Sequence, residues 1–280
     1  MPDLNPTSIR PYQNIIKSAE SGITSETCYR KSEDRSMSGR SMIMRSFAPL
    51  AMLGLMAIAS VAQVATKNSA TEPAPRPDKG WQDRHARFVE RIKKGDVDLL
   101  FIGDSITQGW EGAGKAVWAE EFESKKAVNL GIGGDRTQHV LWRLDNGEID
   151  GISPKAAVVM IGTNNLGANT NEEIVAGISA IVKKLNDKLP KTKVLLLGIF
   201  PRAEKADHPL RARIKAINAE ISKLENDKTV FYTNFGNRFL AEDGSLPKAV
   251  MPDFLHLSSD AYRTWADAIE GDLEGLLSSK

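Results

Sequence analysis

Five short apolar segments divide the C-terminal two thirds of the chain, and they constrain its fold more than any other feature. Most of them end at glycine or proline, and stretches with helical spacing of apolar residues separate them. The segments are 97–102, 127–130, 156–161, 193–199 and 229–233. Continuous apolar runs that alternate with helices are typical of parallel strands buried on both faces. The sequence therefore predicts an α/β fold with a five-stranded parallel sheet covered by helices.

Helical periodicity predicts the elements between these strands. Apolar residues recur at helical spacing over 81–94, 171–189, 210–224 and 259–277. In such folds, ligands bind beyond the carboxyl ends of the strands. We therefore expect the functional residues directly after the strands.

Three predicted strands are followed by small, polar residues. The first leads into Gly103-Asp104-Ser105, the second into the segment 131–135 (GIGGD), and the third into Gly162-Thr163-Asn164. Two nucleotide-binding motifs fail at this edge. Trp110 stands where a phosphate-binding loop needs lysine, and Arg136 stands where a dinucleotide-binding motif needs its last glycine.

Acyl transfer is the chemistry that these residue types fit. It needs a nucleophile, a base, a group that orients the base, and donors for the developing oxyanion. Ser105 is the predicted nucleophile and His256 the predicted base. Asp253 is the predicted carboxylate that orients His256, because residues three apart in one turn of chain can face the same way. The backbone N–H groups of Ser105 and Gly134 and the side-chain amide of Asn164 would form the oxyanion hole.

The pairing of Asp253 with His256 has a structural alternative, and the other three histidines are expected to be structural. Asp253 and His256 could instead form a polar turn that caps the last helix, with a following serine as the N-cap. His85, His139 and His208 lie in a helix, a helical stretch and a loop before proline, and we expect structural roles for all of them.

The N-terminal quarter differs in composition from the rest. Residues 1–36 show no period and are interpreted as a doubtful, disordered extension, because Met37, Met42 and Met44 precede the apolar run FAPLAMLGLMAIASVA. Residues 37–65 resemble a secretory signal peptide, with a retained membrane anchor as the alternative. Residues 66–80 are Pro-rich and predict a mobile linker to a folded domain over 81–280. We therefore expect an exported protein, periplasmic or secreted, without a stable membrane span.

Composition excludes several partner and cofactor classes. The 37 basic and 36 acidic residues give a net charge of +1, which provides no strong field for nucleic acid. Cys28, the only cysteine, lies in the doubtful extension, so a cysteine metal site or a thiol nucleophile is not expected. The sequence thus predicts neither a metal nor another cofactor.

The motifs together resemble the SGNH (GDSL-type) hydrolases. The four motif blocks of that family occur in order as Gly103-Asp104-Ser105, Gly134 within GIGGD, Gly162-Thr163-Asn164, and Asp253-x-x-His256. The stretches GDSITQGW, NLGIGGDRTQHVLWRLDNGE and MPDFLHLS are similar to the catalytic subunits of platelet-activating-factor acetylhydrolase type Ib and their bacterial relatives. The resemblance implies a flavodoxin-like three-layer α/β/α sandwich and a metal-free serine hydrolase with the same triad and oxyanion residues. Members of this branch often pair, so a homodimer is one option.

Three neighbours of the motif residues suggest the acyl specificity. Ile106, Thr163 and Leu255 flank the site and would form a narrow apolar pocket that favours acetyl or another short acyl group. The expected substrate is a small acylated molecule or an acetylated polymer, on either a carbohydrate or a lipid alcohol. Two alternatives stay open: acyl transfer to a second alcohol, and a catalytically silent binding or assembly module.

Overall fold

A single parallel sheet forms the centre of the domain. The computed structural model describes residues 67–278 of the 280-residue chain. The sheet has five strands in the order β2-β1-β3-β4-β5, and every neighbouring pair is parallel. The strands are β1 (Leu99–Gly103), β2 (Ala127–Gly131), β3 (Ala156–Met160), β4 (Lys193–Leu197) and β5 (Val230–Thr233). The predicted five-stranded parallel sheet is confirmed, with strand bounds that shift by one or two residues.

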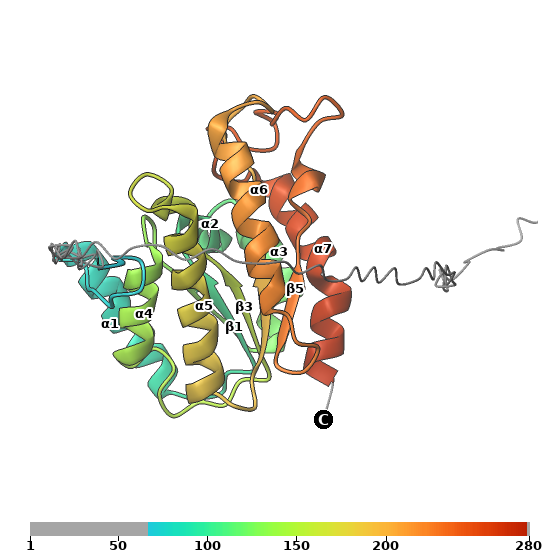
Figure 1. The fold of residues 1–280 in the computed structure, drawn as a ribbon. Helices are drawn as coiled ribbons and strands as arrows, with labels where there is room; N and C mark the ends of the chain where they lie inside the picture. Colours follow the sequence, from blue (N-terminus) through green and yellow to red (C-terminus); the bar gives the residue numbers. More distant parts are fainter. Residues whose placement is uncertain (1–66, 279–280) are drawn as a thin grey trace, which may run out of the picture. The chain divides into compact units, whose positions relative to one another are not determined.

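Helices cover both faces of the sheet, as Figure 1 shows for α4, α5 and α6 in front of the strands and α3 behind them. The helices are α1 (Lys79–Lys93), α2 (Ser105–Gln108), α3 (Lys115–Glu121), α4 (Thr137–Asp145), α5 (Asn171–Lys188), α6 (Pro209–Ile221) and α7 (Ser259–Ser278). Short 3₁₀ turns are Gly109–Glu111, Glu123–Lys125, Thr163–Asn165, Ser222–Leu224 and Gly236–Phe239.

Two apolar cores lie between these layers, one on each side of the sheet. Alternate strand residues such as Leu100 and Val159 pack with α1, α4, α5 and α6, whereas Phe101 and Val158 pack with α3 and α7. Successive side chains of a strand point to opposite faces, so strands buried on both faces are apolar throughout. The expected three-layer α/β/α sandwich is the architecture observed.

Strand register places the functional segments at one level of the sheet. Gly103 at the end of β1 pairs with Gly131 of β2 on one side and with Met160 of β3 on the other. The three polar segments that follow these strands therefore emerge together at the carboxyl edge, near α2 at the top of the sheet in Figure 1.

Residues 67–78, here called the N-terminal strap, pack against the domain, which corrects the prediction of a mobile linker. Ala70 is fully buried and its carbonyl accepts a hydrogen bond from Thr137 Oγ1 at 2.7 Å. The N–H of Ala74 donates to the carbonyl of Gln138 at 3.2 Å. Backbone groups of Ala70 and Ala74 thus bond to α4, so the packed unit begins before the expected residue 81.

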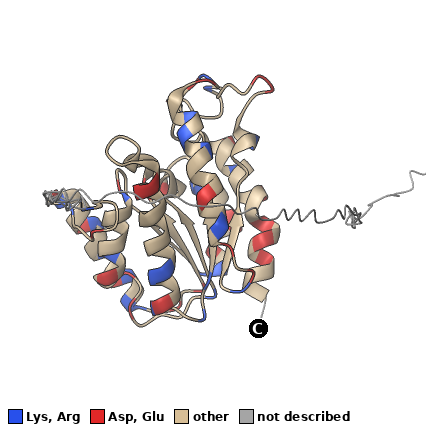
Figure 2. Cartoon of the chain, in the orientation of Figure 1, with Lys and Arg blue, Asp and Glu red and all other residues tan. Residues whose placement is uncertain are grey.

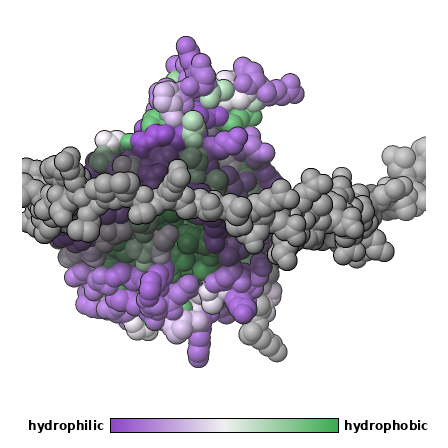
Figure 3. Space-filling model, viewed as in Figure 1, coloured by the Kyte–Doolittle hydropathy of each residue, from purple (hydrophilic) through white to green (hydrophobic). Residues whose placement is uncertain are grey.

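On the side drawn in Figure 2, charged residues of both signs are distributed over the helices. On the face drawn in Figure 3, hydrophilic residues line the lower edge and apolar residues lie above them toward its middle. Within residues 67–278, no helix is both long and apolar enough to cross a membrane. The predicted extension and signal peptide lie outside the described residues.

Candidate active site

Ser105 stands at a sharp turn from β1 into α2. Asp104 is the N-cap residue, and its Oδ1 accepts the N–H of Ile106 at 3.0 Å. Gly103 is required before it, because a Cβ there would lie 2.1 Å from Thr107 Oγ1 and 2.4 Å from the carbonyl oxygen of Met160. The turn leaves Ser105 half-buried at the edge of the sheet.

The loop before α7 brings an imidazole to this serine. His256 Nε2 lies 2.8 Å from Ser105 Oγ, and His256 Nδ1 lies 2.6 Å from Asp253 Oδ2. The other oxygen of Asp253 accepts the backbone N–H groups of Leu255 at 3.1 Å and His256 at 2.7 Å. The structure thus joins in one hydrogen-bonded chain the three side chains that the sequence singled out.

The backbone of Phe254 tightens this loop. Its φ of 59° lies in the left-handed region, which is uncommon for a residue with a large side chain. Two hydrogen bonds hold this conformation, from the Phe254 N–H to the Met251 carbonyl at 2.9 Å and from the Ala203 N–H to the Phe254 carbonyl at 3.0 Å. Surrounding contacts therefore fix the turn in which the Asp253 carboxylate meets the His256 ring.

Hydrogen bonds keep the carboxylate of Asp253 ionised. Partial burial acts to raise its pKa, but hydrogen bonds from the backbone and ring of His256, the charge of that ring, and the N–H of Leu255 together hold the pKa below its ordinary value of 3.8. An anionic carboxylate accepts the Nδ1–H of a neighbouring imidazole, which leaves Nε2 as the acceptor that faces Ser105.

The loop after β2 presents one unused backbone donor near Ser105. Within the described chain, Gly134 is the one position from 132 to 137 whose N–H has no intramolecular acceptor. The acceptors of the others are the Gly103 carbonyl for Ile132, Gln108 Oε1 for Gly133, the Ile132 carbonyl for Asp135, His139 Nδ1 for Arg136 and Asn165 Oδ1 for Thr137.

This loop lies directly against the serine. A Cβ at Gly133 would be 3.7 Å from Ser105 Cβ, so the two backbones approach closely. The φ of Gly134 is 79°, a conformation that glycine adopts without strain. Asn164 reaches the same loop from the end of β3, where its Nδ2 donates to the carbonyl of Asp135 at 2.9 Å. An amide nitrogen carries two hydrogens, so the second is left for another acceptor.

A buried ionic network, which the sequence did not predict, packs against this loop. Arg143 is fully buried, donates to Asp135 Oδ2 at 2.8 Å and forms an ion pair with Glu148. It also donates to the Leu130 carbonyl at 2.9 Å and to the Gly103 carbonyl at 3.3 Å. A single guanidinium therefore ties together the ends of β1 and β2 and the loop that follows β2.

The other three histidines have structural partners. His85 Nδ1 lies 2.8 Å from Glu148 Oε1, and His208 Nδ1 accepts the N–H of Leu210 at the start of α6. His139 Nδ1 accepts the N–H of Arg136 at 3.0 Å. Burial, together with three nearby arginines, lowers the pKa of His139 to about 4, so this imidazole is neutral at physiological pH.

The predicted acyl-pocket residues differ in how accessible they are. Ile106 and Thr163 are each 1% exposed, and Leu255 is half-buried. Thr163 Oγ1 accepts a hydrogen bond from Arg202 at 3.2 Å. In this conformation, Leu255 is thus the one of the three with substantial surface to offer a substrate, while Ile106 belongs to the apolar core beneath α2.

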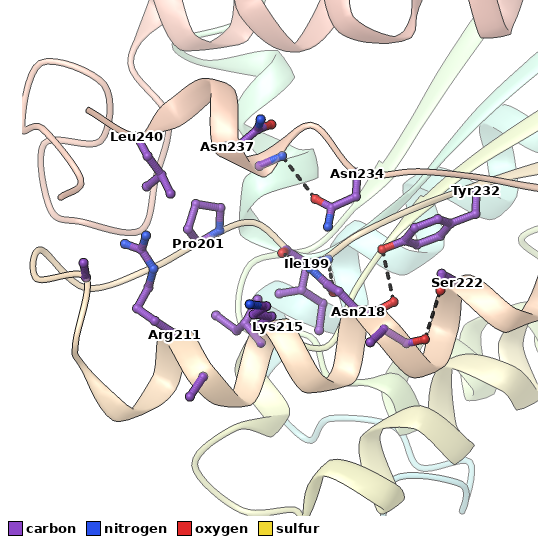
Figure 4. Close-up of a pocket in the computed structure, with 15 residues that line it drawn as sticks. Ile199, Pro201, Arg211, Lys215, Asn218, Ser222, Tyr232, Asn234, Asn237 and Leu240 are labelled. Atoms are coloured by element: carbon purple, nitrogen blue, oxygen red, sulfur yellow. Dashed lines mark hydrogen bonds between the residues drawn. The ribbon is translucent and has the colours of Figure 1, made fainter. Parts of the chain in front are cut away.

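A separate cavity of about 640 Å³ lies between α6 and the ends of β4 and β5 (Figure 4). Ile199 and Leu240 give it apolar walls, and Arg211, Lys215 and Asn234 supply polar groups. The residues that line it include none of the predicted site residues. Among residues 67–278, no cluster of histidine, cysteine and carboxylate side chains could hold a metal ion.

The chain thus combines a three-layer α/β/α fold with a serine, a histidine and a carboxylate in one hydrogen-bonded chain at the carboxyl edge of its sheet. A model of the GDSL-like lipase/acylhydrolase family matches residues 101–264. The platelet-activating factor acetylhydrolase IB subunit alpha2 of Gallus gallus is 43% identical over 189 residues, which are 66% of this chain and 80% of the relative. The chain belongs to the GDSL-like lipase/acylhydrolase family and is a hydrolase.

Solved structures show the same fold. A Streptococcus pneumonia protein described as a platelet activating factor superposes with a TM-score of 0.59 at 25% identity, over 69% of this chain and 92% of the other. The acetyl xylan esterase AlAXEase superposes with a TM-score of 0.54 at 23% identity, over 62% of this chain and 98% of the other. This second likeness concerns the fold alone.

Proposed function

We propose that the protein is a serine esterase that hydrolyses short-chain, principally acetyl, O-esters. The observation that carries the proposal is the hydrogen-bonded chain from Ser105 through His256 to Asp253, 2.8 Å and 2.6 Å long at its two links. This chain of hydrogen bonds lies beside a loop in which the N–H of Gly134 has no intramolecular acceptor. Such an arrangement supplies a nucleophile, a base, an orienting carboxylate and an oxyanion donor at one place.

In the first half-reaction, Ser105 Oγ attacks the ester carbonyl carbon while His256 Nε2 takes the hydroxyl proton. Negative charge then develops on the carbonyl oxygen, where the N–H groups of Ser105 and Gly134 and the free amide hydrogen of Asn164 stabilise it. One such donor contributes about 3–4 kcal/mol to transition-state stabilisation. The intermediate expels the alcohol, which receives the proton from His256, and leaves an acyl group on Ser105.

In the second half-reaction, water attacks the acyl carbon and transfers a proton to His256. The carboxylic acid leaves, and the proton returns from His256 to Ser105 Oγ. Asp253 keeps the Nδ1–H of the imidazole in place through both halves and stabilises the imidazolium that forms.

The preference for a short acyl group rests on two lines of support. The names of the animal relatives describe acetylhydrolases, and a structural neighbour is named an acetyl xylan esterase. In this chain, Leu255, which is half-buried and precedes His256, is the predicted pocket residue with surface that could restrict a long acyl chain. The alcohol is either a carbohydrate or a lipid.

The test compares p-nitrophenyl acetate, butyrate and hexanoate with wild-type protein, Ser105→Ala and Asp253→Asn. We expect acetate to be the best ester, no turnover by Ser105→Ala, and a large loss of kcat in Asp253→Asn. Turnover by Ser105→Ala equal to that of the wild type would overturn the proposal.

A second assay distinguishes the two candidate classes of natural substrate, carbohydrate and lipid. Acetylated xylooligosaccharides and an acetylated phospholipid are offered to the enzyme, and released acetate is measured. Release from the sugar alone assigns a carbohydrate esterase, and release from the lipid alone assigns a lipid acetylhydrolase. Appearance of acetate on an added sugar alcohol in place of free acetate would instead assign acyl transfer.

We further propose export of the protein, which rests on the basic and apolar residues of 37–65. Fractionation of producing cells, with sequencing of the mature N-terminus, tests this proposal. A mature chain that retains residues 37–65 would contradict removal of a signal peptide.

A further inference from the structure

The N-terminal strap contacts the loop that carries Gly134. Arg76 reaches from the strap to this loop, and its Nη1 donates to the carbonyl of Gly133 at 2.6 Å. The same nitrogen lies 3.6 Å from the buried Asp135 Oδ1. A Cβ at Gly134 would lie 3.0 Å from Arg76 Nη1, so the guanidinium is packed directly over this peptide.

Other contacts fix Arg76 itself. Its Nε donates to Asp78 Oδ2 at 3.0 Å, and its carbonyl accepts Gln82 Nε2 at 2.6 Å. Asp78 is in turn the N-cap of α1, where it accepts the N–H of Trp81. Arg76 is therefore held by the first turn of α1 while it holds the Gly133 carbonyl.

The hydrogen bond from Arg76 also determines where the N–H of Gly134 points, because both groups belong to the Gly133–Gly134 peptide. The carbonyl of Gly133 and the N–H of Gly134 belong to the same planar unit, and in a trans peptide they point in opposite directions. A donor that fixes the carbonyl on the strap side therefore fixes the N–H on the opposite side. This N–H is the one that the loop leaves without an acceptor.

A peptide between two glycines needs such a restraint. Glycine occupies positive and negative φ about equally, so rotation of the Gly133–Gly134 peptide meets little steric resistance. A flipped peptide would replace the N–H donor by a carbonyl oxygen, which repels a developing oxyanion. A charge-assisted hydrogen bond is about twice as strong as a neutral one, and it also polarises the peptide so that its N–H becomes a better donor.

We propose that Arg76 is a positioning residue that locks the Gly133–Gly134 peptide in the orientation that presents the Gly134 N–H to the oxyanion. This inference rests on the proposed function, because it assigns a support to the same oxyanion hole. It also gives the N-terminal strap a role in the reaction.

The experiment measures kcat and KM for p-nitrophenyl acetate with Arg76→Ala, Arg76→Lys and the strap control Lys67→Ala. Lys67 pairs with Glu72 on the surface at 2.7 Å and is 75% exposed. Loss of an oxyanion donor lowers kcat by about 10²–10³, and loss of its restraint should lower kcat of Arg76→Ala by about 10–100-fold with KM nearly unchanged. Lys67→Ala should match the wild type.

Two rescues separate positioning from a general structural role. Arg76→Lys retains a cationic donor and should recover most of the lost kcat. Millimolar guanidinium should raise kcat of Arg76→Ala but not of the wild type, because the free ion can occupy the vacated place beside the Gly133 carbonyl. The pH dependence of kcat/KM should be the same in all variants, since Ser105 and His256 are untouched.

The inference is wrong if Arg76→Ala has the kcat of Lys67→Ala. It is equally wrong if kcat falls only in parallel with the melting temperature and neither rescue restores it. If Arg76→Ala unfolds at the assay temperature, the kcat values of Arg76→Gln and Arg76→Lys are compared with that of the wild type at a lower temperature instead. Retained activity in Ser105→Ala would refute the proposed function instead, so the two failures are distinguishable.

Discussion

His256 Nε2 lies 2.8 Å from Ser105 Oγ, although 151 residues separate the two in the chain. The serine follows the first strand of the sheet, and the histidine precedes the last helix. α7 covers the same face as α2, and Tyr262 of α7 donates from its hydroxyl to the carbonyl of Ile106 at 2.6 Å. This contact anchors the first turn of α7 to the residue that follows the nucleophile. It thereby helps to hold His256 next to Ser105.

Substitution of Gly134 should impair turnover more than it impairs folding. Gly134→Ala strains a residue with φ of 79° and places a Cβ 3.0 Å from Arg76 Nη1, so the guanidinium must move by a few tenths of an ångström. We expect kcat for p-nitrophenyl acetate to fall by about 10²-fold or more, as when an oxyanion donor is lost.

Gly151→Ala is the matched control for this change. Gly151 has φ of 76°, yet nothing lies within 4 Å of the position that its Cβ would take. The control carries the same backbone strain away from the site and should keep the wild-type kcat. Equal losses of kcat in the two variants would show that Gly134 has no particular part in the reaction.

Replacement of Arg143 should destabilise the whole domain. Arg143→Met leaves the carboxylates of Asp135 and Glu148 buried without their cation, and removal of one partner of a buried ion pair costs about 3–5 kcal/mol. Urea unfolding followed by circular dichroism gives the free energy of unfolding. Lys183→Ala, which removes an exposed pair with Asp187, should leave that free energy unchanged. A similar value for both variants would contradict a supporting role for the network.

Asp104 should make stability depend on pH in a direction unusual for a carboxylate. Burial raises its pKa from 3.8 to about 7, with a smaller contribution from Asp135, against the opposing effects of the Ile106 N–H, His256 and Arg202. Between these two pH values the folded state binds a proton that the unfolded state releases, so the contribution of Asp104 to stability falls as pH rises to about 7 and is constant above it.

Asp104→Asn tests this behaviour, because the amide oxygen can still accept the N–H of Ile106 but the side chain cannot ionise. Melting temperatures are measured for both proteins from acid to mildly alkaline pH. The variant should gain stability relative to the wild type as pH rises toward neutrality. A difference in melting temperature that is independent of pH would mean that Asp104 has no raised pKa.

Two of the three predicted pocket residues, Ile106 and Leu255, should respond differently to truncation. Leu255→Ala should raise the activity on hexanoate relative to acetate, because it removes a half-exposed wall beside His256. Ile106→Ala instead opens a cavity in the core and should cost about 2–5 kcal/mol of folding free energy. An unchanged chain-length profile in Leu255→Ala would remove Leu255 from the acyl pocket.

Much of the fold and the order of the site residues could be predicted, because both depend on local patterns. Apolar strands that end at glycine indicated the sheet, and its parallel order brought Ser105, Gly134 and Asn164 to one edge. The pairing of Asp253 with His256 followed from their separation by one turn of chain. Each of these inferences needs only the spacing of residues along the sequence.

Features that depend on long-range packing were not predictable in this way. The strap has the composition of a linker, yet its backbone groups bond to α4, and Arg76 finds a partner far away in sequence at Gly133. Arg143 has the helical position of an ordinary surface cation, and its burial follows only from the carboxylates that fold around it. Ile106 was expected to line the pocket, but the tight turn at Ser105 directs it into the core.

Covalent labelling tests the proposed nucleophile most directly, since it needs no knowledge of the substrate. The protein is treated with a fluorophosphonate, digested and mapped by mass spectrometry, with Ser105→Ala as the control. We predict a single adduct on the peptide that contains Ser105, with loss of esterase activity in step with labelling, and no adduct in the variant. A protein that hydrolyses esters but remains unlabelled at Ser105 would contradict the account.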